Sequence, residues 1–426
     1  MTSVPNLKVK EAIRMRVMIV LLSCVLPIQI MGPGAIAVTL ALAFFCFLSL
    51  PQKLNYLKHA FNAALHPVGL MVLIMAIFWV PNITLSSEPV RSFETAIRTF
   101  LFLGLAILFW AILVKNRAVH GLFCRIFIIA SAVAVLIAII AEIAVPGLYW
   151  LINFKGWLDI PIGTSQKSFA ALAVFMVPAL LWAGFRLSGN WIIFAVTSSI
   201  GFITLVGLTY NKAAIAGFIA MSAVAAVLVA RSDRSRILRI GLPGVALTTI
   251  IGTLIWFNIT HQSPRIEGNW FLPLWLVDFQ RQSIWKFSFE LLQQNFWFGM
   301  GINTINFAPG ANAIIPGTID NLNIIPSHPH NWILEVAVET GVFGLLSLLG
   351  AITSSFIHMI RKFLQNGDYA YLIAICMSVG YWVSGLFNFS FWSAWWQISF
   401  VLILALCLSQ NSDSDSSDLE KLRFDL

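Results

Sequence analysis

Charge is what this chain of 426 residues has least of. Asp, Glu, Lys and Arg together make up 10% of the residues, whereas a soluble globular protein carries about 25%. Hydrophobic residues make up 59%, and the mean hydropathy is +0.86. This balance excludes an ordinary soluble protein and predicts an all-α polytopic membrane protein.

Cysteine is also scarce, and several common signatures are missing. The five cysteines all lie in apolar runs and none forms a CxxC pair, so we expect small apolar residues and no disulfide framework. There is no Gly-rich phosphate loop for a nucleotide and no internal repeat. The net charge of +8 fits membrane orientation better than nucleic-acid binding, so no nucleic-acid partner is expected.

Long apolar runs recur from Val17 to Ser409. Most have roughly 18 residues or more, enough to cross a bilayer core of about 30 Å. We expect twelve transmembrane helices in a single integral membrane domain, residues 1–426, and no cleavable signal peptide, because apolar spans continue after the first one. The expected spans are 17–31, 35–50, 66–83, 96–114, 121–144, 168–185, 190–208, 213–230, 238–258, 331–355, 369–388 and 393–409.

The distribution of Lys and Arg favours a cytoplasmic N-terminus. In that orientation 17 of the 26 basic residues lie inside, eight lie outside or at the outer membrane edge, and Arg125 lies within a span. An even number of spans then places the C-terminus in the cytoplasm as well. The eight outer residues are Arg91, Arg98, Lys155, Lys167, Lys212, Arg265, Arg281 and Lys286.

The same orientation places one large loop, residues 259–329, on the outer side. Its apolar and aromatic residues predict that it folds on the membrane surface. Within it, residues 280–296 have apolar side chains at helical spacing and predict an amphipathic helix, which Gly299 and Gly301 would end. Residues 410–426 are polar and acidic, which predicts a disordered cytoplasmic tail.

Polar groups gather where the large loop turns into an apolar helix, in the sequence SHPHNW from Ser327. Pro329 fits the first helical position, so we expect His330 and Asn331 in the first helical turn. Free backbone N–H groups there favour an anion such as phosphate, and the positive helix end favours a neutral imidazole able to accept a proton. Two alternatives stay open: His328 and His330 only cap the helix, or they bind zinc with residues such as His261 and Asp320.

Basic side chains on the outer side suggest a phosphate-bearing ligand. Each alone could be a snorkelling or solvated charge, but all of them run against the usual inside bias. A pyrophosphate-bearing lipid would account for them, because Arg offers bidentate contact to phosphate and Lys a point charge. The candidates are Lys212, Arg281, Arg91, Arg98 and Lys167.

Two carboxylates and two glycines follow along the same helix. Glu335 and Glu339 share one face, and we expect each to pair with a basic group or polar neighbour and hold the bundle together. Gly341 and Gly344 would allow close helix packing in lipid.

These residues carry a family resemblance. His330-Asn331, nine further residues and then Gly341-Val-Phe-Gly344 resemble the pattern H[NSQ]-x9-G-x-x-[GTY] of bacterial O-antigen ligases and related protein O-oligosaccharyltransferases. The stretch from Arg281-Gln-Ser-Ile-Trp to Phe298-Gly-Met-Gly301 is similar to that family's Arg-led helix and Gly-x-Gly turn. The resemblance is specific over about 281–346 and loose elsewhere, and it implies a GT-C-like membrane glycosyltransferase.

The resemblance implies an activity and a set of roles. Such a ligase moves a polysaccharide from undecaprenyl pyrophosphate to the lipid A–core oligosaccharide, among membrane lipids at the periplasmic face of the bacterial inner membrane, with no metal or cofactor. By this likeness His330 is the general base and Arg281 binds the pyrophosphate, while Lys212 stands where the family has a second arginine. Asn331, His328, Arg98, Lys167 and Arg91 would assist substrate binding.

Three classes of function remain open. The first is the ligase. The second is an O-antigen polymerase or a protein O-oligosaccharyltransferase, with similar donor chemistry and a different acceptor. The third is a secondary transporter, which the missing repeat and the placement of polar groups at the outer surface disfavour.

Overall fold

The computed structural model describes residues 4–153, 166–232, 271–316 and 322–409, together with six isolated positions between 244 and 255. Every regular element in this part of the chain is a helix, and the β-type pairing found there is an isolated bridge between Ile314 and Asn323. The all-α class predicted from the composition is confirmed. The tail 410–426 lies outside the described residues, as do most of the expected span 238–258 and parts of the large loop.

The first half of the chain forms long apolar helices with short connections. Its elements are α1 (Val4–Cys24), η1 (Pro27–Met31), α2 (Pro33–Leu48), α3 (Lys53–Ala64), α4 (Pro67–Leu85), α5 (Pro89–Lys115), α6 (Ala118–Ile143) and α7 (Pro146–Ile152).

The second half adds the helices around the polar segment. Its elements are α9 (Lys167–Ala171), α10 (Ala173–Leu187), α11 (Asn190–Leu208), α12 (Lys212–Ser232), α14 (Phe279–Gln294), η2 (Ile305–Phe307), α15 (Trp332–Asn366), α16 (Tyr369–Gly385) and α17 (Ala394–Leu408).

The number of spans differs from the expected twelve. Within the described ranges six helices are long and apolar enough to cross a membrane, and a seventh span results if α2 and α3, bent by 114°, count as one. The apolar helices α10, α16 and α17 are shorter. Helix α11 has the expected bounds, whereas the first expected span, 17–31, divides between α1 and η1. The chain is thus an all-helical membrane protein, and twelve spans stay a prediction.

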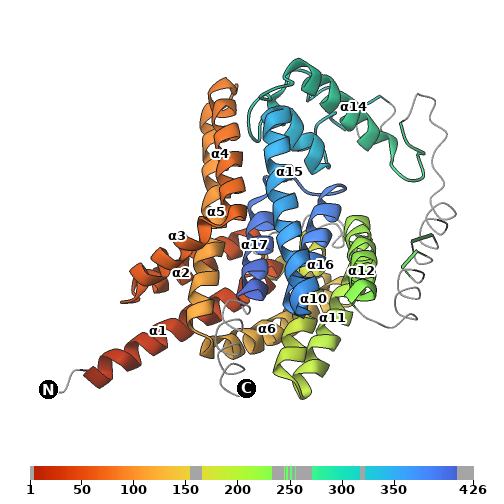
Figure 1. Cartoon of the computed structure of the whole chain (residues 1–426). Helices are drawn as coiled ribbons and strands as arrows, with labels where there is room; N and C mark the ends of the chain where they lie inside the picture. The colour runs from red at the N-terminus through yellow and green to blue at the C-terminus, as the bar shows by residue number, and fades with distance from the viewer. Residues whose placement is uncertain are drawn as a thin grey trace.

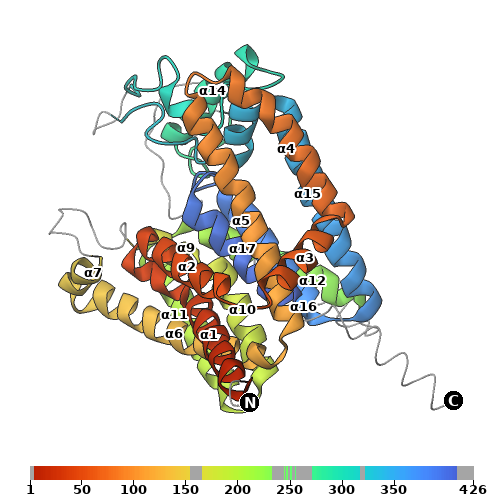
Figure 2. The same ribbon diagram turned by 90° about the vertical axis from the view of Figure 1, so that its left-hand side faces the viewer.

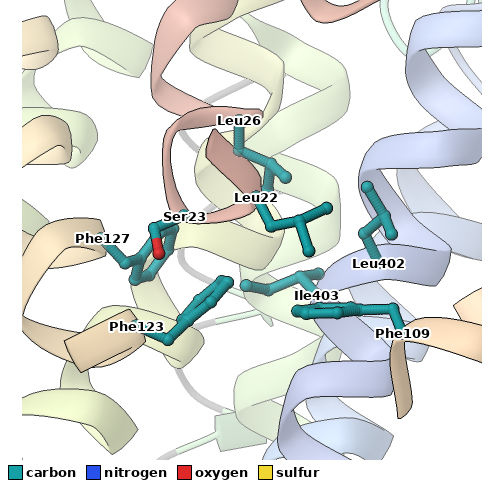
Figure 3. A pocket seen from close by; sticks show the side chains of 8 residues that line it. All are labelled: Leu22, Ser23, Leu26, Phe109, Phe123, Phe127, Leu402 and Ile403. Atoms are coloured by element: carbon teal, nitrogen blue, oxygen red, sulfur yellow. The ribbon is translucent and has the colours of Figure 1, made fainter. Parts of the chain in front are cut away.

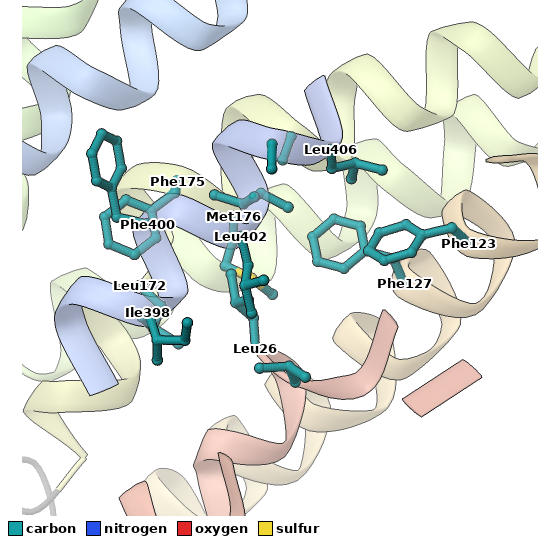
Figure 4. Packing of buried hydrophobic residues seen from close by; sticks show 14 of the residues in the cluster. Leu26, Phe123, Phe127, Leu172, Phe175, Met176, Ile398, Phe400, Leu402 and Leu406 are labelled. Atoms are coloured by element: carbon teal, nitrogen blue, oxygen red, sulfur yellow. The ribbon is translucent and has the colours of Figure 1, made fainter. Parts of the chain in front are cut away.

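The helices form a bundle with α14 lying across one end, beside the N-terminal end of α15 (Figures 1 and 2). The N-terminal end of α1 lies at the opposite end (Figure 1). The main apolar core joins α1, α5, α6, α10, α11 and α17, with Phe127, Phe175 and Leu402 among its members (Figure 4). A small pocket in this core is lined by apolar side chains and by Ser23, whose hydroxyl donates to the Ile19 carbonyl (Figure 3).

Helix α15 is broken at Gly341, where φ is 70° and ψ is 179°. The segment after α14, residues 296–305, crosses the break, and we call it the strap. Strap and helix exchange backbone hydrogen bonds there: Met300 N–H donates to the Val338 carbonyl (3.0 Å), and Val342 N–H donates to the Phe296 carbonyl (2.8 Å). A β-carbon on Gly341 would overlap the Trp297 backbone. Gly341 thus serves close packing, as expected, but against a loop and through a backbone conformation that glycine alone adopts readily.

Gly341→Ala should lower the stability of the protein. The backbone conformation alone costs a residue with a side chain about 1–3 kcal/mol, and the added methyl group also displaces the strap. Gly350→Ala, on the same helix, is the control, because a β-carbon there meets nothing within 4 Å. The thermal unfolding midpoint in detergent should fall for Gly341→Ala and be unchanged or higher for Gly350→Ala; equal midpoints would contradict the role of the break.

Candidate active site

The loop that carries the two histidines precedes α15 and does not belong to it. Asn331 is the N-cap: its side-chain oxygen accepts from the N–H groups of Ile333 (3.0 Å) and Leu334 (3.3 Å). His330 lies before the cap with φ at 55°, a left-handed conformation that is uncommon for a residue with a side chain. The expectation of His330 in the first helical turn is therefore wrong. Because the Asn331 side chain caps the helix, it also occupies backbone N–H groups of the first turn that we expected to be free for an anion.

Both imidazoles bind one backbone carbonyl. The Asn388 carbonyl oxygen accepts from His330 Nδ1 at 2.7 Å and from His328 Nε2 at 2.8 Å, and the ring centroids are 4.2 Å apart. Because a carbonyl oxygen can only accept, both of these ring nitrogens carry a hydrogen. His328 Nδ1 then accepts from the Ser327 hydroxyl (2.8 Å). In neutral His330 the remaining nitrogen, Nε2, is a proton acceptor, and no partner for it is found in the described part of the chain.

The surroundings keep both rings neutral. Burial lowers the pKa of His328 to about 4; the neighbouring His330 lowers it further, and the hydrogen bond to Asn388 opposes the change. Burial also lowers the pKa of His330, against the Asn388 bond, with Arg281 and Lys167 lowering it and Asp278 raising it. Each histidine is therefore in the form that can accept a proton at neutral pH.

Arg281 lies in the first turn of α14. Asp278 caps this helix by accepting from the Arg281 N–H (2.9 Å), and its carboxylate lies 3.6 Å from Arg281 Nε. Farther along α14, the Trp285 indole N–H donates to the Pro329 carbonyl (3.1 Å) and so ties the helix to the histidine loop. The amphipathic helix expected at 280–296 is confirmed as α14, and its start is set by an aspartate cap.

Two lysines from other helices join this group. Asn211, which is buried, caps α12 by accepting from the Ala214 N–H, and its amide donates to the Lys167 carbonyl (3.0 Å). One asparagine thus places Lys167, at the start of α9, beside Lys212, at the start of α12. The charges of Arg281, Asp278 and Lys167 all act on Lys212, and the same three charges act on His330.

Arg91 and Arg98 lie along α5 and are engaged with backbone carbonyls. Arg91 Nε donates to the Asn303 carbonyl (2.6 Å), and its guanidinium lies 5.0 Å from the centre of the Phe307 ring. Arg98 Nη2 donates to the Trp392 carbonyl (2.8 Å). Neither is among the charges that act on His330. Substrate binding by these two arginines stays a prediction; the contacts found are with the protein itself.

Within the described ranges, the carboxylates of α15 bind polar neighbours and not basic groups. Glu339 accepts from three successive strap N–H groups, those of Asn303 (2.7 Å), Thr304 (2.8 Å) and Ile305 (2.9 Å), and from the Trp392 indole. Glu335 accepts from Ser390 Oγ and from the Phe391 N–H (2.6 Å). One of the two pairings we expected, with polar neighbours, is confirmed. The carboxylates hold the strap and the segment between α16 and α17, residues 386–393, which we call the outer turn.

Sequence reasoning missed two groups on which this arrangement depends. The Asn388 carbonyl has no side-chain signal, since any residue supplies a carbonyl. Asn82 in α4 is fully buried; its amide donates to the Phe298 carbonyl (2.8 Å) and its oxygen accepts from the Ile302 N–H (2.8 Å). An asparagine in an apolar run was a usable signal, because a polar residue at membrane depth needs a partner.

The zinc alternative can be compared with the positions of the possible ligands. No group of three or more His, Cys, Asp or Glu side chains with suitable positions occurs in the ranges searched, those that the structure describes. His328 and His330 both direct a nitrogen to the Asn388 carbonyl. His261 and Asp320, the other ligands considered for zinc, lie outside the described residues.

The fold and hydropathy define an integral membrane protein, and comparison with known proteins shows which family part of the chain is similar to. Residues 198–349 match the family described as O-Antigen ligase, so the resemblance seen in the sequence is confirmed for this region. It contains Lys212, Arg281, His330 and both motif glycines.

Curated relatives agree with this match. The chain is 24% identical over 164 residues to a Rickettsia conorii protein and 25% identical over 169 residues to a Rickettsia prowazekii protein, both named for a proposed polysaccharide ligase activity. Each match covers 38% of this chain, and it spans 39% and 40% of the length of these two relatives.

Glu339→Ala should release the strap. It leaves three backbone N–H groups without their acceptor; two of them, those of Thr304 and Ile305, are buried, and each of these costs about 1–3 kcal/mol. Hydrogen–deuterium exchange at residues 303–305 should accelerate, while Glu290→Ala, an exposed carboxylate on α14, should leave it unchanged. Unaltered exchange in Glu339→Ala would show that the strap is held by other contacts.

Proposed function

We propose that the protein is an O-antigen ligase that transfers a polysaccharide from undecaprenyl pyrophosphate to the lipid A–core oligosaccharide. The reaction would take place at the periplasmic face of the bacterial inner membrane, with both termini in the cytoplasm. The family match over 198–349 supports the reaction class. The position of the N-terminal end of α1, at the opposite end of the bundle from α14, supports the orientation (Figure 1).

One observation carries the proposal: His330 donates a hydrogen bond from Nδ1–H to the Asn388 carbonyl, so its other ring nitrogen, Nε2, is the acceptor. A general base needs a free lone pair within reach of the hydroxyl that it activates. The lowered pKa of His330 keeps that lone pair available at neutral pH. A histidine that merely capped the helix would direct a nitrogen to the helix end, but Asn331 performs that task.

Each residue then has a separate role in the proposed reaction. The acceptor hydroxyl gives its proton to His330 Nε2 while its oxygen forms a bond with the anomeric carbon of the donor. The bond from that carbon to the pyrophosphate oxygen breaks, and its electron pair leaves with the pyrophosphate. Arg281 stabilises this charge, and Lys212 and Lys167 add positive charge beside it. Lys212 keeps the charge of the family's arginine but not its bidentate contact.

An O-antigen polymerase or a protein O-oligosaccharyltransferase would use the same donor chemistry. The groups described here act on the donor and on a hydroxyl, so they are compatible with each acceptor. Identifying the acceptor that is modified in cells therefore distinguishes the ligase from the polymerase and the protein O-oligosaccharyltransferase.

Substitution of the proposed catalytic residues should stop transfer without loss of protein. His330→Ala removes the base, and a fall of about 10²–10⁴-fold is expected. Arg281→Ala removes stabilisation of the leaving group, with a loss of about 10²–10³-fold. Lys212→Arg should retain more activity than Lys212→Ala. The assay is complementation of a ligase-null Gram-negative host of the same strain, read as the O-antigen ladder on a lipopolysaccharide gel at matched membrane levels.

Lys286→Ala is the matched control for Arg281→Ala, because Lys286 is an exposed cation on the same helix. Full activity in His330→Ala would exclude the base assignment. If the wild type gives no ladder although it reaches the membrane and the donor lipid is present, the ligase proposal fails, and polymerase and protein glycosylation assays follow.

The pH dependence should reflect a histidine with a lowered pKa. Transfer requires neutral His330, so kcat/KM should be constant above its pKa and fall as pH decreases through it. Because burial lowers this pKa, the midpoint should lie below the ordinary value of about 6.5. Purified protein in nanodiscs, with lipid-linked donor and core acceptor, allows the measurement. A midpoint above the ordinary value would contradict either the base or its described surroundings.

A further inference from the structure

The outer turn is attached to α15 through one buried carboxylate. Glu335 is 1% exposed, and its two oxygens accept from the Ser390 hydroxyl and the Phe391 N–H. The Ser390 hydroxyl in turn accepts from the Trp392 N–H (3.0 Å). The Glu335 carboxylate and three successive residues of the turn are thus joined in one network. No ion pair of Glu335 is found in the ranges that the structure describes.

The same turn presents the carbonyl that both histidines bind. Asn388 lies two residues before Ser390, and its carbonyl oxygen accepts from His330 Nδ1 and His328 Nε2. Helix α16, which leads into the turn, is itself tied to α15 by the bond from the Trp332 indole to the Trp382 carbonyl (2.9 Å). The direction of the Asn388 carbonyl is therefore set by contacts to α15, which begins directly after the histidine loop.

We propose that Glu335 is a positioning residue: through Ser390 and the Phe391 N–H it holds the outer turn so that the Asn388 carbonyl selects the Nδ1–H tautomer of His330. The proposal rests on the proposed function of His330 as the base. It explains why a transmembrane helix carries a carboxylate for which the described residues offer no basic partner, since such a residue is costly unless it has a role.

Tautomer selection matters because the two nitrogens of a neutral imidazole differ only in which one carries the hydrogen. If the carbonyl turned away, His330 could carry its hydrogen on Nε2 and would then present no acceptor to the substrate. The charged groups that act on His330, namely Arg281, Asp278 and Lys167, make no hydrogen bond to Nδ1 in the described part of the chain, and neither does the adjacent ring of His328.

The network needs hydrogen-bond acceptors and not a negative charge. In Glu335→Gln the amide oxygen can accept from the Phe391 N–H, and the amide N–H can donate to Ser390 Oγ, which reverses its role. Glu335→Gln should therefore keep at least about half of the activity. Ser390→Ala and Glu335→Ala should each lower kcat about 10- to 100-fold, as does removal of groups that orient a functional histidine. The KM for the lipid-linked donor should not change, because Arg281 and Lys212 are untouched.

Two measurements on the full-length protein in nanodiscs test the proposal. The first is ¹⁵N NMR of histidine-labelled protein, with His330 assigned by the signal lost in His330→Ala. Wild type and Glu335→Gln should show hydrogen on Nδ1, and Ser390→Ala should show a shift toward Nε2. The second is kcat and KM for transfer. Ser355→Ala is the control, because that hydroxyl donates only to its own helix at Ala351.

The outcomes separate the two proposals. If Ser390→Ala and Glu335→Ala keep the wild-type tautomer, the positioning role is overturned, whatever the activity. If Glu335→Gln is as inactive as Glu335→Ala, the carboxylate acts by its charge and the proposal also fails. If wild type shows no transfer but the tautomer responds to Ser390→Ala, the proposed function is wrong and the structural coupling stands.

Discussion

The arrangement of this protein depends on hydrogen-bond satisfaction where little water is available. The strap and the outer turn are irregular segments whose backbone N–H groups do not pair within a helix. In an apolar setting an unsatisfied group of this kind costs several kcal/mol. Glu339 and Glu335, one helical turn apart, accept from these N–H groups, and Asn82 does so from α4. Because these acceptors lie on transmembrane helices, the membrane domain dictates the shape of the polar segments above it.

The break in α15 serves the same end. A continuous helix would use its carbonyls internally, but at Gly341 the backbone opens, and carbonyls of the helix become acceptors for the strap. The spacing between the histidine loop and the glycine pair therefore has a physical meaning. It sets the length of helix between the histidine loop and the place where the strap crosses, and both carboxylates lie within that length. The motif describes one structural unit and not two separate features.

The sequence predicts the helical class, the start of α12 and the location of α14 well, because hydropathy and helical spacing are local signals. It also identifies the histidine segment, since polar residues are rare in such a chain. It fails on the conformation of His330. Pro329 is compatible with the first helical position, which we expected, and also with a place two residues before the Asn331 cap, where the structure has it. The role of Asn388 could not be predicted at all, since its contribution is a backbone carbonyl more than fifty residues away along the chain. The roles of the basic residues in substrate binding stay predictions.

Trp285 has a further consequence for how helix α14 can be exchanged between relatives. Its indole joins α14 to the Pro329 carbonyl, so the helix that carries Arg281 is attached to the loop that carries His330. A chimera that replaced α14 while keeping the arginine but not the indole would preserve every charged group and lose the attachment between the two. Helix α14 and the histidine loop are thus one exchangeable module, and a chimera with a relative would need its boundaries outside both.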